Sequence, residues 1–263
     1  MSATAANSPA GAPQPARHFL RLSYLGAPFH GWQTQPNASS VQETLERGLS
    51  TVMRVPVAVT GAGRTDAGVN ATMMIAHADL PRRVEDDRQL VRALNSILGP
   101  AIAVQSVTPV HPQAHARFDA TARTYHYYAH TTKNPFCGGL SWQAPPTLDF
   151  DAMNSAAALL TDVSDFTSFS KLHTNVKTNI CRVSQAVWRR PLPGEFAPAG
   201  AEWVFEITAD RFLRNMVRAV VGTLVDVGRG KLTLDGFRRI IDARDRCAAG
   251  TSMPATPLFL HRI

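Results

Sequence analysis

The sequence predicts an α+β protein of two domains, each with a largely antiparallel sheet flanked by helices. Three observations lead to this fold class. Short apolar or alternating segments, typical of strands, are interleaved with segments of helical periodicity. The connections between predicted strands are too short for parallel crossovers throughout, which favours antiparallel pairing. The pattern breaks at residues 109–113, which predicts a joint between domains of residues 17–110 and 111–263.

The first predicted domain follows residues 1–16, which are rich in Ala, Pro and Ser and carry no charged side chain. Such a composition cannot offset the entropy lost on folding, so we expect a disordered tail. Ser40 is expected to cap a helix, because Glu43 follows it at the spacing of a capping box. The predicted elements are, in order, a strand at 19–24, a helix at 41–49, strands at 55–59 and 71–80, a helix at 90–98 and a strand at 102–107.

The second predicted domain opens with an aromatic-rich strand at residues 122–128. Because side chains alternate along a strand, Tyr125 and Tyr127 share one face, and His126 and Tyr128 share the other. Tyrosine is also common in strands for packing alone, so the pattern by itself does not indicate a site. The further predicted elements are a helix at 151–160, strands at 183–188 and 203–208, helices at 212–227 and 234–241, and a strand at 257–260.

A glycine-rich loop at residues 60–71 separates two predicted strands of the first domain. Within it, Asp66 follows Arg64 by two residues, and three glycines allow positive φ and the close approach of a ligand. Asp66 is therefore a candidate for a chemical role. The same residues also fit an ordinary turn in which the aspartate bonds its own backbone.

Basic residues recur at the start of the predicted helix at 212–227. Arg211, Arg214 and Arg218 follow the spacing i, i+3 and i+7, which places them along one face of a continuous helix. Like charges stacked in this way repel, so they favour an anionic or carboxylate partner. A solvated surface stripe fits the same spacing.

Composition limits the partners of this chain. Its 263 residues are 44% hydrophobic, enough for a sizeable core, and the net charge of +7 favours an anionic partner such as nucleic acid. Cys137, Cys181 and Cys247 have neither disulfide nor zinc spacing, which is typical of a reducing cytoplasm. No apolar run approaches the ~20 residues of a membrane span. We therefore expect a cytoplasmic protein with no membrane partner.

Familiar catalytic motifs are missing from the sequence. It contains no GxxxxGK[ST] phosphate loop, no complete dinucleotide fingerprint, no HExxH metal motif and no GxSxG nucleophile elbow. We therefore expect neither a cofactor nor a metal. A carboxylate, arginines and a tyrosine on a basic chain remain, and this set suits chemistry on a nucleic-acid base.

Ordered blocks of residues from about Phe19 to Ile263 carry a family resemblance. The blocks are Tyr24-Leu-Gly26 with Phe29-His-Gly-Trp-Gln33, Val41-Gln42, Gly63-Arg-Thr-Asp-Ala-Gly-Val69, Ala116-Arg-Phe118 with Ala122-Arg123, Tyr125, Asp165-Phe-Thr-Ser-Phe169, Phe212, Asn215-Met-Val-Arg218, Gly222 and Pro257-Leu-Phe-Leu260. In these blocks the chain resembles the bacterial tRNA pseudouridine synthases of the TruA type. One departure is Asn70, at a position where the family usually has histidine.

The resemblance implies roles for individual residues. Asp66 is expected to be the catalytic carboxylate, with Arg64 and Arg218 beside it in the catalytic site, and Tyr125 to stack on the target base. Of the three arginines near the predicted helix, only Arg218 is expected next to Asp66. The remaining residues expected to bind substrate are Leu258, Arg211 and Arg214.

The resemblance also implies an activity and an assembly. The expected reaction converts uridine to pseudouridine at positions 38–40 of the tRNA anticodon stem-loop, without a cofactor. The expected protein is a homodimer that cradles tRNA, with an active cleft between the two domains of each chain. Whether Asp66 attacks C1′ of the sugar or acts as a base stays open.

A catalytically silent tRNA-binding module, or an RNA chaperone on the same fold, is the alternative. The enzyme and this alternative both predict salt-sensitive binding to tRNA. A binding module has no use for a carboxylate that repels phosphate, so Asp66 among arginines favours the enzyme.

Overall fold

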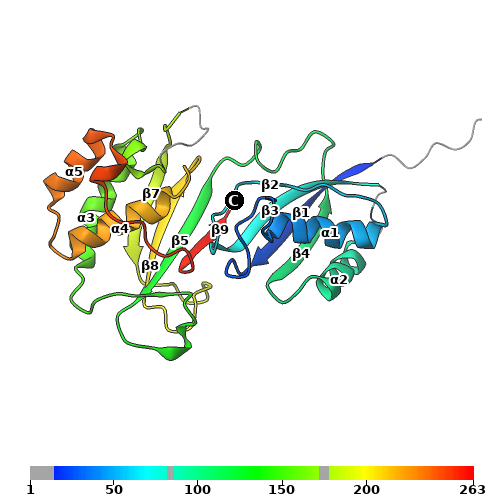
Figure 1. The fold of residues 1–263 in the computed structure, drawn as a ribbon, viewed down its shortest axis with the longest axis horizontal. Helices are drawn as coiled ribbons and strands as arrows, with labels where there is room; N and C mark the ends of the chain where they lie inside the picture. Colours follow the sequence, from blue (N-terminus) through cyan, green and yellow to red (C-terminus); the bar gives the residue numbers. More distant parts are fainter. Residues whose placement is uncertain (1–14, 82–83, 85, 172–177) are drawn as a thin grey trace, which may run out of the picture.

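The computed structural model describes residues 15–81, 84, 86–171 and 178–263 (Figure 1). Most of the tail expected at residues 1–16 lies outside these residues. Ala16 already belongs to the first strand, β1 (Ala16–Tyr24), where it pairs with Leu80 of β3 (Asn70–Leu80). Ala16, which the composition places in the tail, is therefore part of the sheet.

The strands of the described residues form one mostly antiparallel sheet, in the order β4-β1-β3-β9-β5-β8-β7, with β2 added to β3 and β6 added to β5. The mixed α and β composition and the antiparallel pairing are confirmed, but the two expected sheets are joined. The junction is a short parallel pairing of β3 with β9, through Asn70 with Phe259 and Ala71 with Leu260. The other strands are β2 (Thr60–Gly61), β4 (Ile102–Pro109), β5 (Arg123–His130), β6 (Trp142–Gln143), β7 (Val183–Arg189), β8 (Trp203–Ala209) and β9 (Leu258–Arg262).

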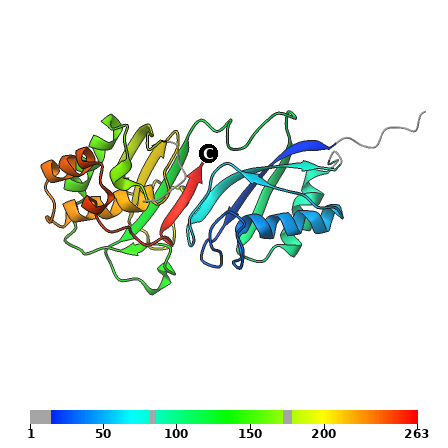
Figure 2. The same ribbon diagram turned by 45° about the horizontal axis from the view of Figure 1, so that its top comes forward.

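The described residues form five α-helices, α1 and α2 beside the half of the sheet that contains β1, and α3, α4 and α5 beside the half that contains β8 (Figures 1 and 2). Ser40 caps the first helix as predicted, because its hydroxyl accepts a hydrogen bond from the Glu43 amide at 3.2 Å. The helices are α1 (Val41–Met53), α2 (Asp87–Ile97), α3 (Phe150–Ala158), α4 (Met216–Gly228) and α5 (Leu234–Ala243), with short 3-10 helices η1 (Pro135–Cys137), η2 (Leu159–Asp162), η3 (Thr167–Phe169) and η4 (Arg246–Ala248).

The strand predicted at residues 55–59 is wrong. Val57 and Val59 are buried as the apolar pattern requires, but their amides bond side chains of α1 instead of another strand. The Val57 amide donates to the Ser50 hydroxyl at 3.0 Å, and the Val59 amide donates to the Glu46 carboxylate at 2.9 Å. Because the helix satisfies these donors, pairing with β3 begins only at Thr60.

The alternation predicted for β5 is confirmed. Tyr127 is fully buried in the main core, which also contains Leu258 of β9. Tyr128 lies on the other face, in a small separate cluster with Val204 and Phe259. The sheet thus has apolar contacts on both faces near β5. Across the described ranges, no helix is both long enough and apolar enough to cross a membrane.

Candidate active site

The loop that carries Asp66 is held by residues that precede it in the chain. The Trp32 amide donates to the Thr65 carbonyl at 3.1 Å, and the hydroxyls of Thr65 and Tyr24 are 2.8 Å apart. Gly31 allows this approach: its φ is 95°, and a Cβ there would lie 2.6 Å from the Thr65 carbonyl oxygen. The Asp66 side chain, 29% exposed, is therefore presented to solvent from a fixed backbone.

Asn70 connects this loop to both halves of the sheet. Its side chain is fully buried, accepts from the Gly26 amide at 2.8 Å and donates to the Thr256 carbonyl at 2.6 Å. A carboxamide supplies one acceptor and donors in a single plane, which fits these two backbone groups. The residue that departs from the resemblance is thus a structural link between the Asp66 loop and the segment that leads into β9.

Among the described residues, Arg214 is the arginine that forms an ion pair with Asp66. Its Nε atom lies 3.8 Å from a carboxylate oxygen of Asp66, and its side chain is 61% exposed. Arg64 is exposed on the loop itself. The resemblance leads to the expectation that Arg218 lies next to Asp66, but the Nε atom of Arg218 donates to the Met253 carbonyl at 2.6 Å. Asp66 therefore meets a residue of the second half of the chain, and the contact differs from the expected one.

The arginine stripe expected along one continuous helix is wrong. Helix α4 begins only at Met216, because Asn215 has a left-handed backbone with φ of 65°. Arg211 and Arg214 therefore precede the helix, and helical spacing does not relate them to Arg218. A guanidinium nitrogen of Arg211 lies 3.4 Å from the Thr178 carbonyl oxygen.

Tyr125 of β5 is a buried residue whose hydroxyl is influenced by the Asp66 charge. Its ring meets the edge of Phe212, with the ring centres 5.0 Å apart at 84°, and only 9% of the residue is exposed. Burial, and then the negative charge of Asp66, raise the pKa of the Tyr125 hydroxyl well above its ordinary value. Tyr125 thus keeps its proton at neutral pH.

Leu258, which the resemblance implies as a substrate contact, lies in the core. It is 4% exposed and pairs with Tyr127 across β5 and β9. As the first residue of β9, it follows directly on the segment that Asn70 holds. Leu258 is therefore a core residue, two positions after the Thr256 carbonyl that Asn70 binds.

Arg123 is a residue whose role the sequence does not reveal. Its guanidinium donates to four carbonyl oxygens at 2.8 to 2.9 Å, and these come from three segments of the chain. They belong to Ala62 in the Asp66 loop, Arg117 and Ala120 before β5, and Asp210 before Arg211. Arg123 therefore fixes the Asp66 loop relative to the segment that carries the basic residues. Its place in the Ala122-Arg123 block was the available signal, but that block suggests no partner.

One group of side chains in the described part of the chain has the composition of a metal site: His126, Glu195 and His261. The two imidazole rings are stacked, with centres 3.8 Å apart at 12°, so their in-plane lone pairs do not converge on one ion. Arg189 pairs with Glu195 at 2.7 Å and also with Glu206. We therefore describe this group as a buried ion-pair network, on the sheet face opposite Tyr125.

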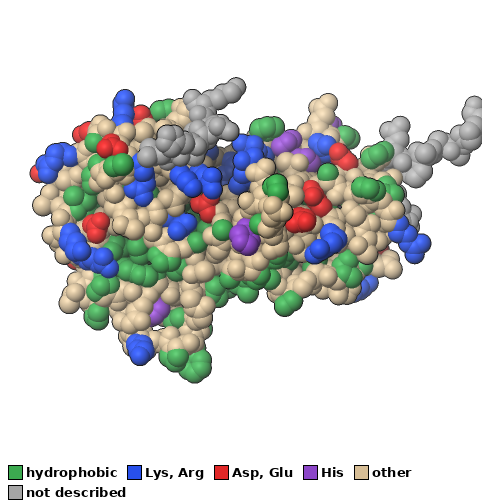
Figure 3. Space-filling view, in the orientation of Figure 1, with side chains coloured by type: hydrophobic (Ala, Val, Ile, Leu, Met, Phe, Trp, Pro, Cys, Tyr) green, Lys and Arg blue, Asp and Glu red, His purple; other side chains and the backbone are tan. Residues whose placement is uncertain are grey.

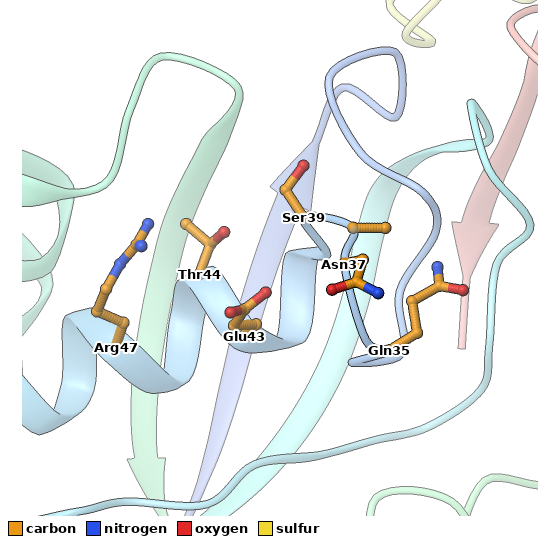
Figure 4. Close-up of a pocket in the computed structure, with 7 residues that line it drawn as sticks. Gln35, Asn37, Ser39, Glu43, Thr44 and Arg47 are labelled. Carbon is orange, nitrogen blue, oxygen red and sulfur yellow. The ribbon is translucent and has the colours of Figure 1, made fainter.

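The surface shows a cluster of basic side chains and a pocket. Figure 3 shows Lys and Arg side chains gathered near the middle of one face, where the two halves of the sheet meet. A pocket shown in Figure 4 lies at the start of α1, and none of the expected site residues lines it. Its lining residues are Gln35, Asn37, Ala38, Ser39, Glu43, Thr44 and Arg47.

Comparisons with known proteins show the family to which the chain belongs. A family model described as tRNA pseudouridine synthase matches residues 22–119 and 156–263. A tRNA pseudouridine synthase A of Parabacteroides distasonis is 55% identical over 244 residues, which cover 93% of this chain and 94% of the relative. The proteins of the same name from Bacteroides thetaiotaomicron and Porphyromonas gingivalis are 56% and 55% identical, covering 94% of this chain and 90% and 96% of their own lengths. The chain therefore belongs to the tRNA pseudouridine synthase family.

Proposed function

We propose that this chain converts uridine to pseudouridine at positions 38–40 of the tRNA anticodon stem-loop. The observation that carries the proposal is the partly exposed Asp66 carboxylate, which lies 3.8 Å from Arg214 and whose charge helps to raise the pKa of the Tyr125 hydroxyl. Membership of the family makes the chain an isomerase, so the silent RNA-binding alternative is not retained. The relatives are named for tRNA, and the net charge of +7 suits that polyanion.

The chemistry asks for the groups that this site contains. The bond between N1 of uracil and C1′ of ribose breaks, the base turns, and C5 bonds C1′. C5 then loses its proton, and N1 gains one. The Asp66 carboxylate can attack C1′ or remove a proton from the sugar, and either route needs it on a fixed backbone beside the base. The Tyr125 ring is proposed to hold the base, and its hydroxyl is available to transfer a proton.

The target nucleotide must leave its stack before it reaches Asp66. Unstacking costs a few kcal/mol and costs least in or near a loop. Nucleotides 38–40, at the edge of the anticodon loop, meet this condition. Arg64 and Arg214, both exposed beside Asp66, are available for the phosphates on either side.

We further propose that residues 17–110 and 111–263 act as two domains around one active cleft, in a cytoplasmic homodimer. Two contacts across the halves support the cleft: the ion pair of Asp66 with Arg214 and the bond from Asn70 to Thr256. The family model also matches in two separate segments, the first mostly within residues 17–110 and the second within residues 111–263. Light scattering of the purified protein tests the dimer, and a monomeric mass at micromolar concentration would contradict it.

The position of the target is tested with tRNA transcripts labelled with tritium at C5 of uridine. Release of tritium to water reports each isomerisation. We expect release from a transcript that has uridine at positions 38–40 and none when cytidine replaces all three. Equal release from both transcripts would place the target elsewhere in the tRNA while leaving the reaction itself intact.

A further inference from the structure

Phe118 is an exposed aromatic residue close to the active site. Its side chain is 75% exposed, on the segment that links β4 to β5. A single exposed apolar residue is common on protein surfaces and is not evidence of a site. The way in which the surrounding residues hold this ring, and the place where they hold it, are more informative.

The ring is the outer member of a column of three aromatic rings. It stacks on His115, with centres 4.2 Å apart at 30°, and His115 meets the edge of His77 of β3 at 4.5 Å. Backbone amides fix the column: those of Arg117 and Phe118 donate to Nδ1 of His115 at 3.1 and 3.3 Å, and that of Ala116 donates to Nδ1 of His77 at 3.1 Å. The outer ring is therefore held by its neighbours before any ligand binds.

Arg123 places this column beside the Asp66 loop. One guanidinium nitrogen of Arg123 donates both to the Arg117 carbonyl at 2.8 Å and to the Ala62 carbonyl at 2.9 Å. The carbonyl of Arg117, the residue before Phe118, therefore accepts from the same nitrogen as the Ala62 carbonyl of the Asp66 loop. The exposed guanidinium of Arg117 lies 5.8 Å from the centre of the Phe118 ring, so a cation accompanies the aromatic surface.

We propose that Phe118 is a stacking platform for an unpaired nucleobase of the substrate RNA, the one next to the target uridine, with Arg117 at its phosphate. The inference rests on the proposed function. When the target leaves its stack, its neighbour loses one stacking partner. A preorganised aromatic ring replaces that partner for any base, because every base has a π-face. Phe118 has no hydrogen-bonding group, so the platform tolerates different sequences at that nucleotide.

Four variants test the platform on full-length protein. Phe118→Trp keeps a stacking surface, Phe118→Leu keeps apolar bulk without a π-face, and Phe118→Ala removes both. Phe136→Ala is the matched control, because Phe136 is 83% exposed and lies beyond the opposite end of β5. Thermal melts with each variant confirm folding before the RNA measurements.

The expected result is a loss of affinity without a loss of chemistry. Phe118→Ala and Phe118→Leu should raise KM for tRNA about 5- to 100-fold, with the saturated single-turnover rate nearly unchanged. Phe118→Trp and Phe136→Ala should match the parent protein. In an Asp66→Asn background, 2-aminopurine placed next to the target uridine of a synthetic stem-loop should be quenched on binding, and Phe118→Ala should abolish that quenching.

Three results would overturn the platform. If Phe118→Leu binds as well as the parent, the contact is apolar packing and not stacking. If Phe118→Ala halves the mass seen by light scattering but keeps RNA affinity, the ring sits against a second copy of the chain. If no variant changes KM or quenching, the ring does not meet RNA. If the parent protein itself released no tritium, the proposed function would be refuted. The quenching measurement would still report on Phe118.

Discussion

Replacing Arg123 with lysine removes a planar fork while keeping its charge. Lysine cannot reach four carbonyls in three segments, so at least two of the bonds at 2.8 to 2.9 Å are lost. At about 1 kcal/mol net for each hydrogen bond, we expect the free energy of unfolding to fall by ~2 kcal/mol. The Ala62 carbonyl also loses its tether, and a displacement of about 1 Å in a catalytic loop can cost ~100-fold in rate.

The assay pairs urea denaturation with single-turnover tritium release from saturating tRNA. Arg189→Lys is the matched control: it also breaks a guanidinium fork, to Glu195 and Glu206, but on the sheet face opposite Tyr125. We expect Arg123→Lys to lower both stability and rate, and Arg189→Lys to lower stability alone. If Arg123→Lys loses stability but keeps the parental single-turnover rate, Arg123 does not position the Asp66 loop.

Three further predictions follow from the site and the core. Tyr125→Phe should keep tRNA affinity, and Tyr125→Ala should lose ~1 to 3 kcal/mol of it in a filter-binding assay; a slow single turnover for the phenylalanine variant would show that the hydroxyl transfers a proton. Arg211→Ala should flatten the salt dependence of binding by about one ion and leave the saturated rate intact, whereas Arg214→Ala, which also breaks the pair with Asp66, should slow that rate as well; equal effects on both quantities would make both residues simple phosphate contacts. Burial, and then the neighbouring His261, lower the pKa of His126 to about 4, so the unfolded chain binds a proton below pH 6.5 that the folded chain does not bind, and this group alone should lower the free energy of unfolding by roughly 2 kcal/mol between pH 6.5 and 4.5; because the pKa values of His261 and His77 are lowered as well, His126→Phe should reduce this slope, without removing it, in urea melts at each pH.

Local patterns predict much of this fold. The Ser40 cap, the helix that follows it and the two faces of β5 depend on neighbours in the sequence, and all three are confirmed. The missing strand at residues 55–59 depends on distant side chains of α1, which satisfy its amides. The joining of the two expected sheets depends on the pairing of Asn70 with Phe259, almost 190 residues apart in the chain. Composition and periodicity carry no information about such contacts.

The candidate site is also only partly predictable from the sequence. Residue types and the resemblance single out Asp66, but they do not predict that Asn215 has a positive φ, and this conformation moves Arg214 off the helix and toward the carboxylate. The function of Arg123 is also not predictable from local patterns, because its four acceptors are main-chain carbonyls and any residue type can supply them. Sequence spacing relates side chains to one another, so it does not reveal an arginine that binds main-chain carbonyls.

The central claim is that Asp66 carries out the isomerisation, and tritium release by Asp66→Asn tests it most directly. Asparagine keeps the shape of the side chain and removes the carboxylate, while the exposed pair with Arg214 contributes little to stability. We predict that this variant folds, binds tRNA at least as tightly as the parent because a charge facing phosphate is gone, and releases tritium at least ~1000-fold more slowly in a single turnover. A folded Asp66→Asn protein that releases tritium at a rate within about tenfold of the parent would contradict the account.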